Sequence, residues 1–193
     1  MIGVIVQARM GSSRLPGKVM MQVKGKTLIQ YLWNQLSGVN KAARIILATT
    51  VEQTDDVLVD LAKANEFSYF RGAEEDVLSR FYYAATENQL SHIVHISADC
   101  PLVDPLIVNQ IIEYYLENDT EFVHSGLSYA EGLDCEIFSY SALEEAFYCA
   151  QLKYERGHVA MYLHNHPDRF KKNTFNNSTD DSRYRFTLDE KED

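Results

Sequence analysis

The residues best suited to chemistry lie in the segment Gln7-Ala-Arg-Met-Gly-Ser-Ser-Arg-Leu-Pro-Gly-Lys18. It carries three basic side chains, Arg9, Arg14 and Lys18. Its glycines and serines let backbone N–H groups approach an anion closely, and three nearby positive charges suit a polyanion. The segment therefore predicts an anion-binding loop. The alternative is a surface loop whose charges are solvated.

The spacing within this loop excludes the two commonest nucleotide-binding motifs. Five residues separate Gly11 from Gly17, one more than the P-loop pattern G-x-x-x-x-G-K-[ST] allows, and Val19 stands where that pattern needs a hydroxyl. The later Gly25-Lys-Thr fails as well, because Met20 occupies the position of the first glycine. The G-x-G-x-x-G spacing of dinucleotide folds is also absent. Any nucleotide would be held in another way.

A carboxylate follows another apolar run. Asp99 comes just after the strand-like segment His92–Ser97. In open α/β sheets ligands bind beyond the carboxyl ends of the strands, which is also where the basic loop leaves its own strand. A carboxylate on that rim suits a hard cation that bridges phosphate oxygens. The alternative is that Asp99 only forms a turn ahead of Pro101.

Composition bounds the class of protein. The chain has 193 residues, 46% of them hydrophobic, and a formal net charge of -10. These values predict one globular domain over residues 1–193, and the acidic balance argues against general binding of nucleic acid or anionic membranes. No apolar run approaches the roughly 18–20 residues of a membrane span. Three cysteines without close spacing predict reduced thiols, and we expect a cytoplasmic protein.

The first half alternates β-rich runs with helical patterns, which is typical of an α/β fold with a largely parallel sheet. Four strand–helix units are expected. The predicted strands are Ile2–Ala8, Arg44–Thr49, Phe67–Arg71 and His92–Ser97; the predicted helices are Thr27–Leu36, one capped by Thr54, Glu75–Asn88 and one opened by Asp104 and Pro105.

The second half has shorter β-like pieces. They lie at Glu121–His124, Leu133–Phe138, Phe170–Phe175 and Arg183–Leu188, and a Ser141–Glu144 capping box predicts a helix over Ser141–Ala150. Together the halves predict a single α/β domain of three layers. Its central sheet is mostly parallel, with some antiparallel strands in the C-terminal half.

Six ordered segments give the chain a specific resemblance. It resembles the cytidylyltransferases that activate acidic sugars, above all the spore-coat polysaccharide (SpsF-type) branch, with acylneuraminate and 3-deoxy-manno-octulosonate cytidylyltransferases as relatives. The segments are Ile5–Lys18, Phe70-Arg-Gly-Ala-Glu-Glu-Asp-Val-Leu-Ser-Arg-Phe81, Ala98-Asp-Cys-Pro-Leu102, Gly132-Leu-Asp-Cys-Glu136, Arg156-Gly-His-Val159 and Arg185-Phe-Thr-Leu-Asp-Glu-Lys-Glu-Asp193. The match covers nearly the whole chain.

The resemblance implies a GT-A-like nucleotide-binding fold, CTP as donor, Mg²⁺ as cofactor and often a homodimer. It makes Asp99 and Asp189 metal ligands. The second motif departs from the usual Asp-Thr-Pro-Glu-Asp, because Glu190 and Lys191 replace Thr and Pro. Relatives continue beyond this point, so a chain truncated at its C-terminus and a poorly ordered Asp189 remain alternatives.

The resemblance also assigns contacts to the substrates. For the acceptor sugar these are Asp134, Glu136, Arg156 and His158, with Asp134 and Glu136 on one face of a strand and Arg156 and His158 at the start of a helix. An exposed acidic strand face and a capping histidine are the alternatives. For the nucleotide the contacts are Ala8, Arg9, Gly11, Ser12, Ser13, Arg14, Lys18, Arg71 and Gly72; for Arg71 a surface pair with Glu74 or Glu75 is the alternative.

Two further groups are expected to stand outside the chemistry. His164 and His166 form an HxH pair without a third ligand nearby, and a helical spacing of two directs them apart, so we interpret them as surface histidines. Cys100 and Cys135 neighbour the candidate carboxylates, but no base that could activate a thiol is evident.

The sequence thus leads to one hypothesis and two alternatives. The hypothesis is transfer of CMP from CTP to the hydroxyl of a sugar, acidic or a precursor of a cell-surface polysaccharide, with release of pyrophosphate. Arg9, Arg14 and Lys18 would hold the triphosphate, and Asp99 would act through Mg²⁺. The first alternative is a GT-A glycosyltransferase, which normally has an Asp-x-Asp motif. The second is a nucleotide-binding protein without catalysis.

Overall fold

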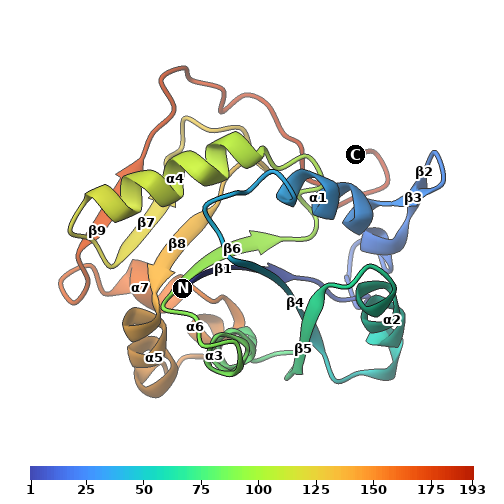
Figure 1. Ribbon diagram of the computed structural model, residues 1–193, viewed down its shortest axis with the longest axis horizontal. Helices are drawn as coiled ribbons and strands as arrows, with labels where there is room; N and C mark the ends of the chain where they lie inside the picture. Colours follow the sequence, from blue (N-terminus) through green and yellow to red (C-terminus); the bar gives the residue numbers. More distant parts are fainter.

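A seven-stranded sheet forms the centre of the computed structural model, which describes all 193 residues (Figure 1). The strand order is β5-β4-β1-β6-β8-β7-β9. All neighbouring pairs are parallel except those that β8 makes with β6 and β7. The strands are β1 (Ile2–Gln7), β4 (Arg44–Thr50), β5 (Ser68–Gly72), β6 (His92–Ser97), β7 (Phe122–Ser125), β8 (Glu136–Ser139) and β9 (Lys172–Phe175).

Helices cover both faces of this sheet, which confirms the predicted three-layer α/β fold. Helices α1 (Leu28–Leu36), α2 (Asp56–Ala64) and α4 (Pro105–Glu117) share one buried apolar cluster with Val4 and Val6 of β1. Helices α3 (Val77–Glu87), α5 (Tyr140–Cys149) and α7 (Met161–Asn165) share a second cluster with Ile5. Residues alternate between the faces along a strand, so β1 is buried on both sides. The short helix α6 (Lys153–Gly157) packs beside α3 and α7.

The four predicted strands of the first half are confirmed to within one residue at each end. Their near-continuous apolar character is explained by burial between two helical layers. Because β1 is central and pairs with both β4 and β6, the loop after β1 emerges between the ends of its two neighbours. The basic segment is therefore placed at the middle of the carboxyl edge of the sheet.

The second half departs from the prediction in two places. Residues 183–188 do not form a strand; they make one isolated parallel bridge between Arg185 and Glu131. The strand predicted at Leu133–Phe138 begins three residues later, at Glu136. Only β8 runs antiparallel in the large sheet, so the expected antiparallel strands reduce to one.

Helix starts were predicted with mixed success. Asp104 caps α4 by accepting a hydrogen bond from Leu106 N, with Pro105 in the first turn, as expected. For α5 the predicted cap was wrong, because Ser139 rather than Ser141 accepts the bond from the third helical residue. Thr54 does not cap α2 either; it lies in a 3₁₀ turn, η2 (Gln53–Asp55), that precedes the helix.

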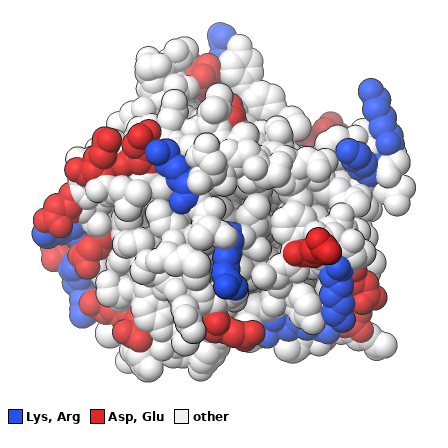
Figure 2. All heavy atoms as spheres, in the orientation of Figure 1, with Lys and Arg blue, Asp and Glu red and all other residues white.

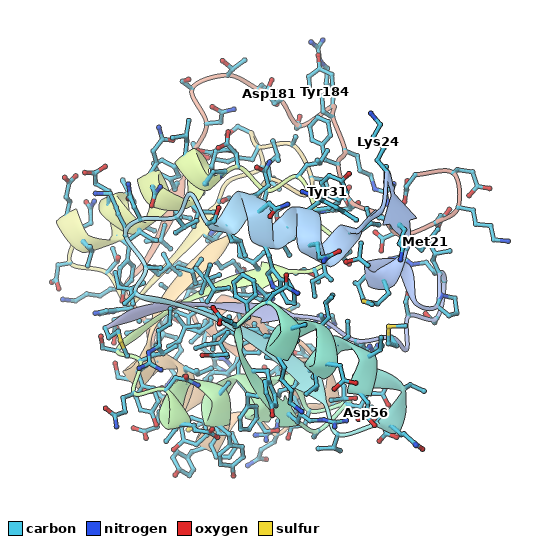
Figure 3. The ribbon with its side chains drawn as sticks, turned by 45° about the vertical axis from the view of Figure 1, so that its right-hand side comes forward. Met21, Lys24, Tyr31, Asp56, Asp181 and Tyr184 are labelled. Atoms are coloured by element: carbon cyan, nitrogen blue, oxygen red, sulfur yellow. The ribbon has the colours of Figure 1, made fainter.

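A small hairpin sits outside the main sheet, formed by β2 (Gln22–Val23) and β3 (Lys26–Thr27) after a 3₁₀ turn, η1 (Lys18–Met20). Tyr31 of α1 fixes it by donating a hydrogen bond of 3.0 Å to Val23 O, and Lys24 projects from its tip into solvent (Figure 3). In the same view Asp181 and Tyr184 lie on the long segment after β9, on the far side of α1 from Asp56. This segment leads back to the carboxyl edge of the sheet.

Charges are unevenly spread over the molecule. On the face shown in Figure 2, Asp and Glu side chains gather along the left-hand edge, whereas Lys and Arg side chains are scattered. Arg9, Arg14 and Lys18 all come from the one loop that follows β1. None of the helices combines the length and apolar character that crossing a membrane would need.

Candidate functional site

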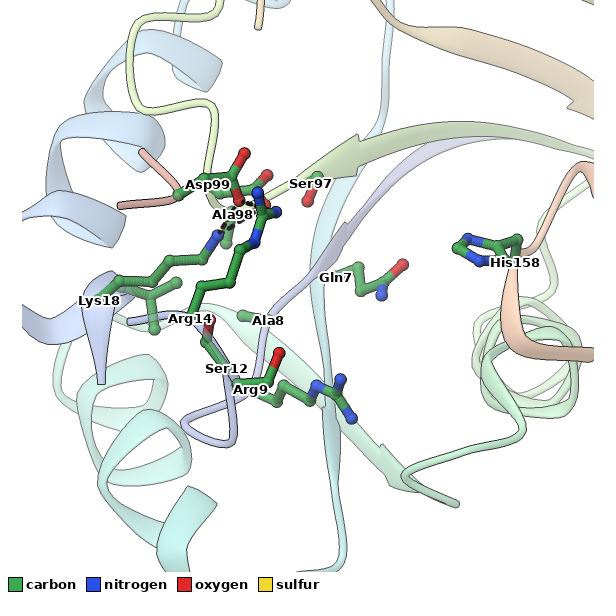
Figure 4. Close-up of a pocket in the computed structure, with 13 residues that line it drawn as sticks. Gln7, Ala8, Arg9, Ser12, Arg14, Lys18, Ser97, Ala98, Asp99 and His158 are labelled. Atoms are coloured by element: carbon green, nitrogen blue, oxygen red, sulfur yellow. Dashed lines mark hydrogen bonds and ion pairs between the residues drawn. The ribbon is translucent and has the colours of Figure 1, made fainter. Parts of the chain in front are cut away.

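A cavity of 310 Å³ opens at the carboxyl ends of β1 and β6 (Figure 4). The loop after β1 forms one wall, the start of the loop after β6 forms another, and His158 lies across from them. The lining residues are Gln7, Ala8, Arg9, Ser12, Ser13, Arg14, Lys18, Val19, Ser97, Ala98, Asp99, His158 and Asp189. The structure thus brings together most of the residues that the sequence predicts for the nucleotide and the metal; Gly11 lies in the same loop.

Lys18 is at the centre of the charged wall. Its Nζ lies 2.9 Å from Asp99 Oδ2 and 2.9 Å from Asp189 Oδ1, and only 10% of its side chain is exposed. The two carboxylates come from the middle and the end of the chain, and a single ammonium group holds them together. This arrangement places two oxygen ligands side by side at the cavity wall.

Three basic side chains surround Asp189. Besides Lys18, Arg14 contacts its Oδ1 at 2.7 Å and Arg185 contacts its Oδ2 at 3.1 Å. Burial alone would raise the pKa of Asp189, but these three cations outweigh it and hold the pKa below its usual range. Asp189 is therefore a carboxylate at neutral pH, and three basic side chains contact it at the cavity wall.

The tail that carries Asp189 is tied to the site by its backbone. Leu188 N donates to Asp99 O at 2.8 Å, and Asp193 accepts a hydrogen bond from Asp189 N at 2.7 Å. Gly132 permits the close approach of this tail. A Cβ at that position would lie 2.9 Å from Phe186 C, and its φ of +92° is one that side chains disfavour.

A buried carboxylate that the sequence analysis missed anchors the basic loop. Asp55 is 1% exposed and accepts hydrogen bonds from Met10 N at 2.7 Å, Thr49 Oγ1 at 3.0 Å and Thr50 N at 3.1 Å, as well as from the Thr50 hydroxyl. Burial alone would raise its pKa, but these bonds outweigh it and keep the pKa low. In the sequence, the hydroxyl residues Thr49 and Thr50 a few positions earlier are the only signal of this role.

The loop itself is closed by its own backbone. Met10 O accepts hydrogen bonds of 2.9 Å from both Ser12 N and Gly17 N, and Gly17 adopts a φ of +72°. These contacts direct Arg9 outward, where it pairs with Glu74 at 3.0 Å while lining the cavity. Arg9, Arg14 and Lys18 are thus all engaged by carboxylates, and the cavity remains open between them.

Arg71 and Gly72 do not line this cavity, and their contact with the nucleotide stays a prediction. Arg71 donates to Thr50 O at 2.8 Å and Glu52 O at 2.8 Å and pairs with Asp56 at 2.6 Å. Arg71 therefore pairs with neither Glu74 nor Glu75, which were the partners expected for a surface arginine. The guanidinium group braces the loop after β4 and thereby supports the position of Asp55.

Arg156 and His158 are both predicted to contact the acceptor, and only His158 reaches the cavity. His158 lines it, whereas Arg156 pairs with Asp76 at 2.5 Å and donates to Phe147 O at 2.7 Å. The two residues also end α6 instead of opening a helix. Arg156 joins the start of α3 to α5, which is a structural role.

Asp134 and Glu136 do not face the same way, because β8 begins only at Glu136. Asp134 lies in the preceding turn, where it accepts a hydrogen bond from Gly132 N at 2.8 Å and borders a second cavity of 690 Å³. Glu136 lies between His164 at 2.8 Å and His95 at 3.3 Å. Burial would raise its pKa, but these bonds lower it to about 2.

The other candidate ligands give no additional site. His164 points to Glu136 and His166 stacks on Tyr162, so the HxH pair does point apart, although His164 is half-buried in a polar network. All three cysteines are free, and burial raises the pKa of Cys100 and Cys135, which argues against thiolate chemistry. No cluster of three or more His, Cys, Asp and Glu side chains is arranged to hold a metal ion.

Comparisons with known proteins agree with this arrangement. The profile of the family described as Cytidylyltransferase matches residues 3–192. The spore coat polysaccharide biosynthesis protein SpsF of Bacillus subtilis is 31% identical, over 98% of this chain and 81% of its own. Protein MJ1063 of Methanocaldococcus jannaschii is 37% identical, over 86% of this chain and 68% of its own.

Solved structures show the same fold. A cytidylyltransferase from Leptospira borgpetersenii serovar Hardjo-bovis superposes with a TM-score of 0.93 at 35% identity, covering 97% of this chain and 81% of that one. A CMP:2-keto-3-deoxy-manno-octonic acid synthetase complexed with CTP gives a TM-score of 0.75 at 14% identity, covering 98% and 93%. The second likeness concerns the fold alone.

Proposed function

Since this chain belongs to the cytidylyltransferase family and is of the SpsF type, we propose that it transfers CMP from CTP to the hydroxyl of a sugar and releases pyrophosphate. The observation that carries the proposal is the cavity at the ends of β1 and β6, where three cations of one loop face two carboxylates from distant segments. Phosphoryl-type transfers need positioning and charge stabilisation more than covalent catalysis by the protein.

The triphosphate would be held by Arg9, Arg14 and Lys18. Each of them is paired with a carboxylate, so the phosphates would replace protein carboxylates as partners. Arg9 and Arg14 have side chains 42% and 58% exposed, and such pairs contribute little stability, so exchanging them costs little. Ser12 and Ser13 add hydroxyl and backbone donors on the same wall.

Asp99 and Asp189 fit a magnesium ion. Mg²⁺ in phosphate-transfer sites is usually bound through one or two carboxylates together with substrate phosphates, and these two carboxylates already converge on one cation, the Lys18 ammonium. When bound, the metal would polarise the α-phosphate and offset charge on the leaving group. The lining has three cations against two carboxylates, so its net positive charge is small beside the negative charge of a triphosphate. A divalent cation would supply the remainder.

The acceptor would enter opposite the charged wall. His158 is exposed there, and Gln7 and Ser97 lie between it and Lys18 as uncharged hydrogen-bonding groups. We propose His158 as a contact of the acceptor sugar, and Asp134 and Glu136 as acidic groups nearby on the same edge of the sheet. The names of the relatives favour a sugar of a cell-surface polysaccharide as the acceptor.

A thermal-shift panel of the four nucleoside triphosphates, each with and without Mg²⁺, tests the donor. A rise in melting temperature that is largest for CTP and requires Mg²⁺ supports the proposal. A response to nucleotide sugars instead would favour a glycosyltransferase, and binding of CTP without pyrophosphate release, whatever sugar is added, would favour a binding protein. Indifference to all four nucleotides would contradict the proposal.

Variants then test the residues. Lys18→Met and Asp99→Asn are each expected to abolish pyrophosphate release from CTP, because they remove the bridging cation and a metal ligand. Lys26→Met is the matched control, since Lys26 is an exposed lysine of β3 outside the cavity. Pyrophosphate release by either site variant at the wild-type rate would remove these residues from the reaction.

A further inference from the structure

Arg80 of α3 is a buried cation that the proposed reaction does not use. Its side chain is 0% exposed, although it is the largest of the fully buried side chains. Its Nη1 donates to Ala73 O at 2.6 Å and to Glu74 O at 3.3 Å. Its Nε and Nη2 are buried without any hydrogen-bond acceptor, and none of its nitrogens pairs with a carboxylate.

Burying this charge without a carboxylate partner lowers the stability of the fold. A charge buried without a partner strongly destabilises a protein in general, and buried arginines therefore almost always have a carboxylate partner. Burial and the nearby charge of Arg9 lower the pKa of Arg80 to about 10, against the opposite effect of the carboxylates of Asp55, Glu74 and Asp76, so the group stays charged at neutral pH. The chain thus keeps a buried positive charge that it does not neutralise by direct contact.

The position of Arg80 links it to the cavity through Arg9. Its side chain runs under Gly72, where a Cβ would lie 3.0 Å from Arg80 Cγ, and its guanidinium group holds the carbonyls of the next two residues. The second of these is Glu74, the ion-pair partner of Arg9. Arg80 therefore fixes the segment that holds Arg9 and at the same time repels Arg9.

We propose, building on the proposed function, that Arg80 is a positioning residue for the nucleotide phosphates. Its buried charge acts on Arg9 at the cavity, and the anionic triphosphate adds negative charge to a region where no carboxylate contacts Arg80 directly. Arg80 does not touch the phosphates; it acts on them through Arg9 and through its own field in a poorly solvated region. A fixed, desolvated charge of this kind favours ligands in proportion to their negative charge.

Two substitutions separate the charge of Arg80 from its hydrogen bonds. Arg80→Gln keeps a donor for the carbonyl of Ala73 but removes the charge, whereas Arg80→Lys keeps both the charge and a donor. Calorimetry with CTP and with CMP, each with Mg²⁺, is the measurement. For Arg80→Gln we expect CTP affinity to fall about tenfold or more and CMP affinity to fall about twofold, with Arg80→Lys close to wild type. A merely structural role would weaken both nucleotides equally.

A measurement on the wild-type protein tests the inference even if the variants fail to fold. In an NMR titration with CTP and Mg²⁺ the Nε–H signal of Arg80 is expected to shift together with that of Arg9. The Nε–H of Arg44, at the opposite end of β4, serves as the unmoved control. If wild type binds CTP but the Arg80 signal stays in place, or if Arg80→Gln binds CTP as wild type does, the inference is overturned and the proposed function stands. If wild type does not bind CTP, both fail.

Discussion

Replacing Asp55 by asparagine is expected to detach the basic loop from the sheet. Three of the hydrogen bonds to Asp55 converge on Oδ2, and only the bond from Met10 N reaches Oδ1. In Asp55→Asn the amide oxygen can occupy one of these places only. Placed at Oδ2, it keeps the bonds from Thr49 and Thr50, and the amide NH₂ then faces the N–H of Met10, donor against donor.

The cost follows from that single lost contact. A hydrogen bond to a charged acceptor contributes about 1.5–3 kcal/mol, and its loss leaves the Met10 N–H without an acceptor in a partly buried position. For a chain of this length each kcal/mol lowers the melting temperature by about 2–4 °C, so a fall of about 3–12 °C is expected. Because Met10 O also accepts bonds from Ser12 N and Gly17 N, a shift at Met10 moves the whole loop.

Thermal unfolding together with CTP titration checks this prediction. Thr49→Val is the matched control, because it removes one hydrogen bond to Oδ2 without touching Met10; about 1 kcal/mol of stability should be lost while CTP affinity is kept. Asp55→Asn should lose both stability and affinity. If Asp55→Asn is destabilised but binds CTP as tightly as Thr49→Val does, the loop does not depend on this anchor and the reasoning is refuted.

Two further predictions concern folding. Glu136 has a folded pKa of about 2 against an ordinary 4.5: burial alone would raise the pKa, but the bonds with His164 and His95 outweigh burial and lower it. A depressed carboxyl pKa stabilises the fold above about pH 4.5, and this stabilisation is lost as the pH falls towards 2; urea unfolding across that range should therefore depend less on pH in Glu136→Gln, and an unchanged dependence would contradict the assignment. Ser139→Ala should cost about 1 kcal/mol in urea unfolding, because Ser139 caps α5, and Ser141→Ala should cost clearly less; the reverse order would restore the cap predicted from the sequence.

The sequence predicts the core of this fold well because its signals are local and redundant. Strands such as β1 and β6 are short apolar runs between turn residues, and burial between two helical layers requires that pattern. The strand predicted at Arg183–Leu188 failed for the opposite reason. The backbone of this segment makes one bridge to Glu131, and Leu188 N donates to Asp99 O. Both contacts are with residues far away in the sequence, so no local pattern predicts them.

Within the site, position along the chain was predictable but side-chain direction was not. Arg9, Arg14 and Lys18 follow a central strand directly, so their place at the sheet edge follows from topology. Arg71 also follows a strand end, yet its guanidinium group turns to the carbonyls of the neighbouring loop, which no local pattern encodes. The same holds for Asp55, whose side chain reaches Met10 N of a distant loop, and for Arg80, whose guanidinium group turns to the carbonyls of the loop before α3.

The ion pairs at the cavity wall affect how Mg²⁺ and CTP bind. Three cations contact Asp189, namely Lys18, Arg14 and Arg185, whereas Lys18 is the only cation that contacts Asp99. A divalent cation arriving without nucleotide would have to displace the Lys18 ammonium and would leave that buried cation unpaired, which is costly. A triphosphate arriving with the metal gives Lys18 a new anionic partner at the same moment. We therefore expect Mg²⁺ and CTP to bind with positive coupling, and calorimetry of each alone and of both together should show that each raises the affinity for the other.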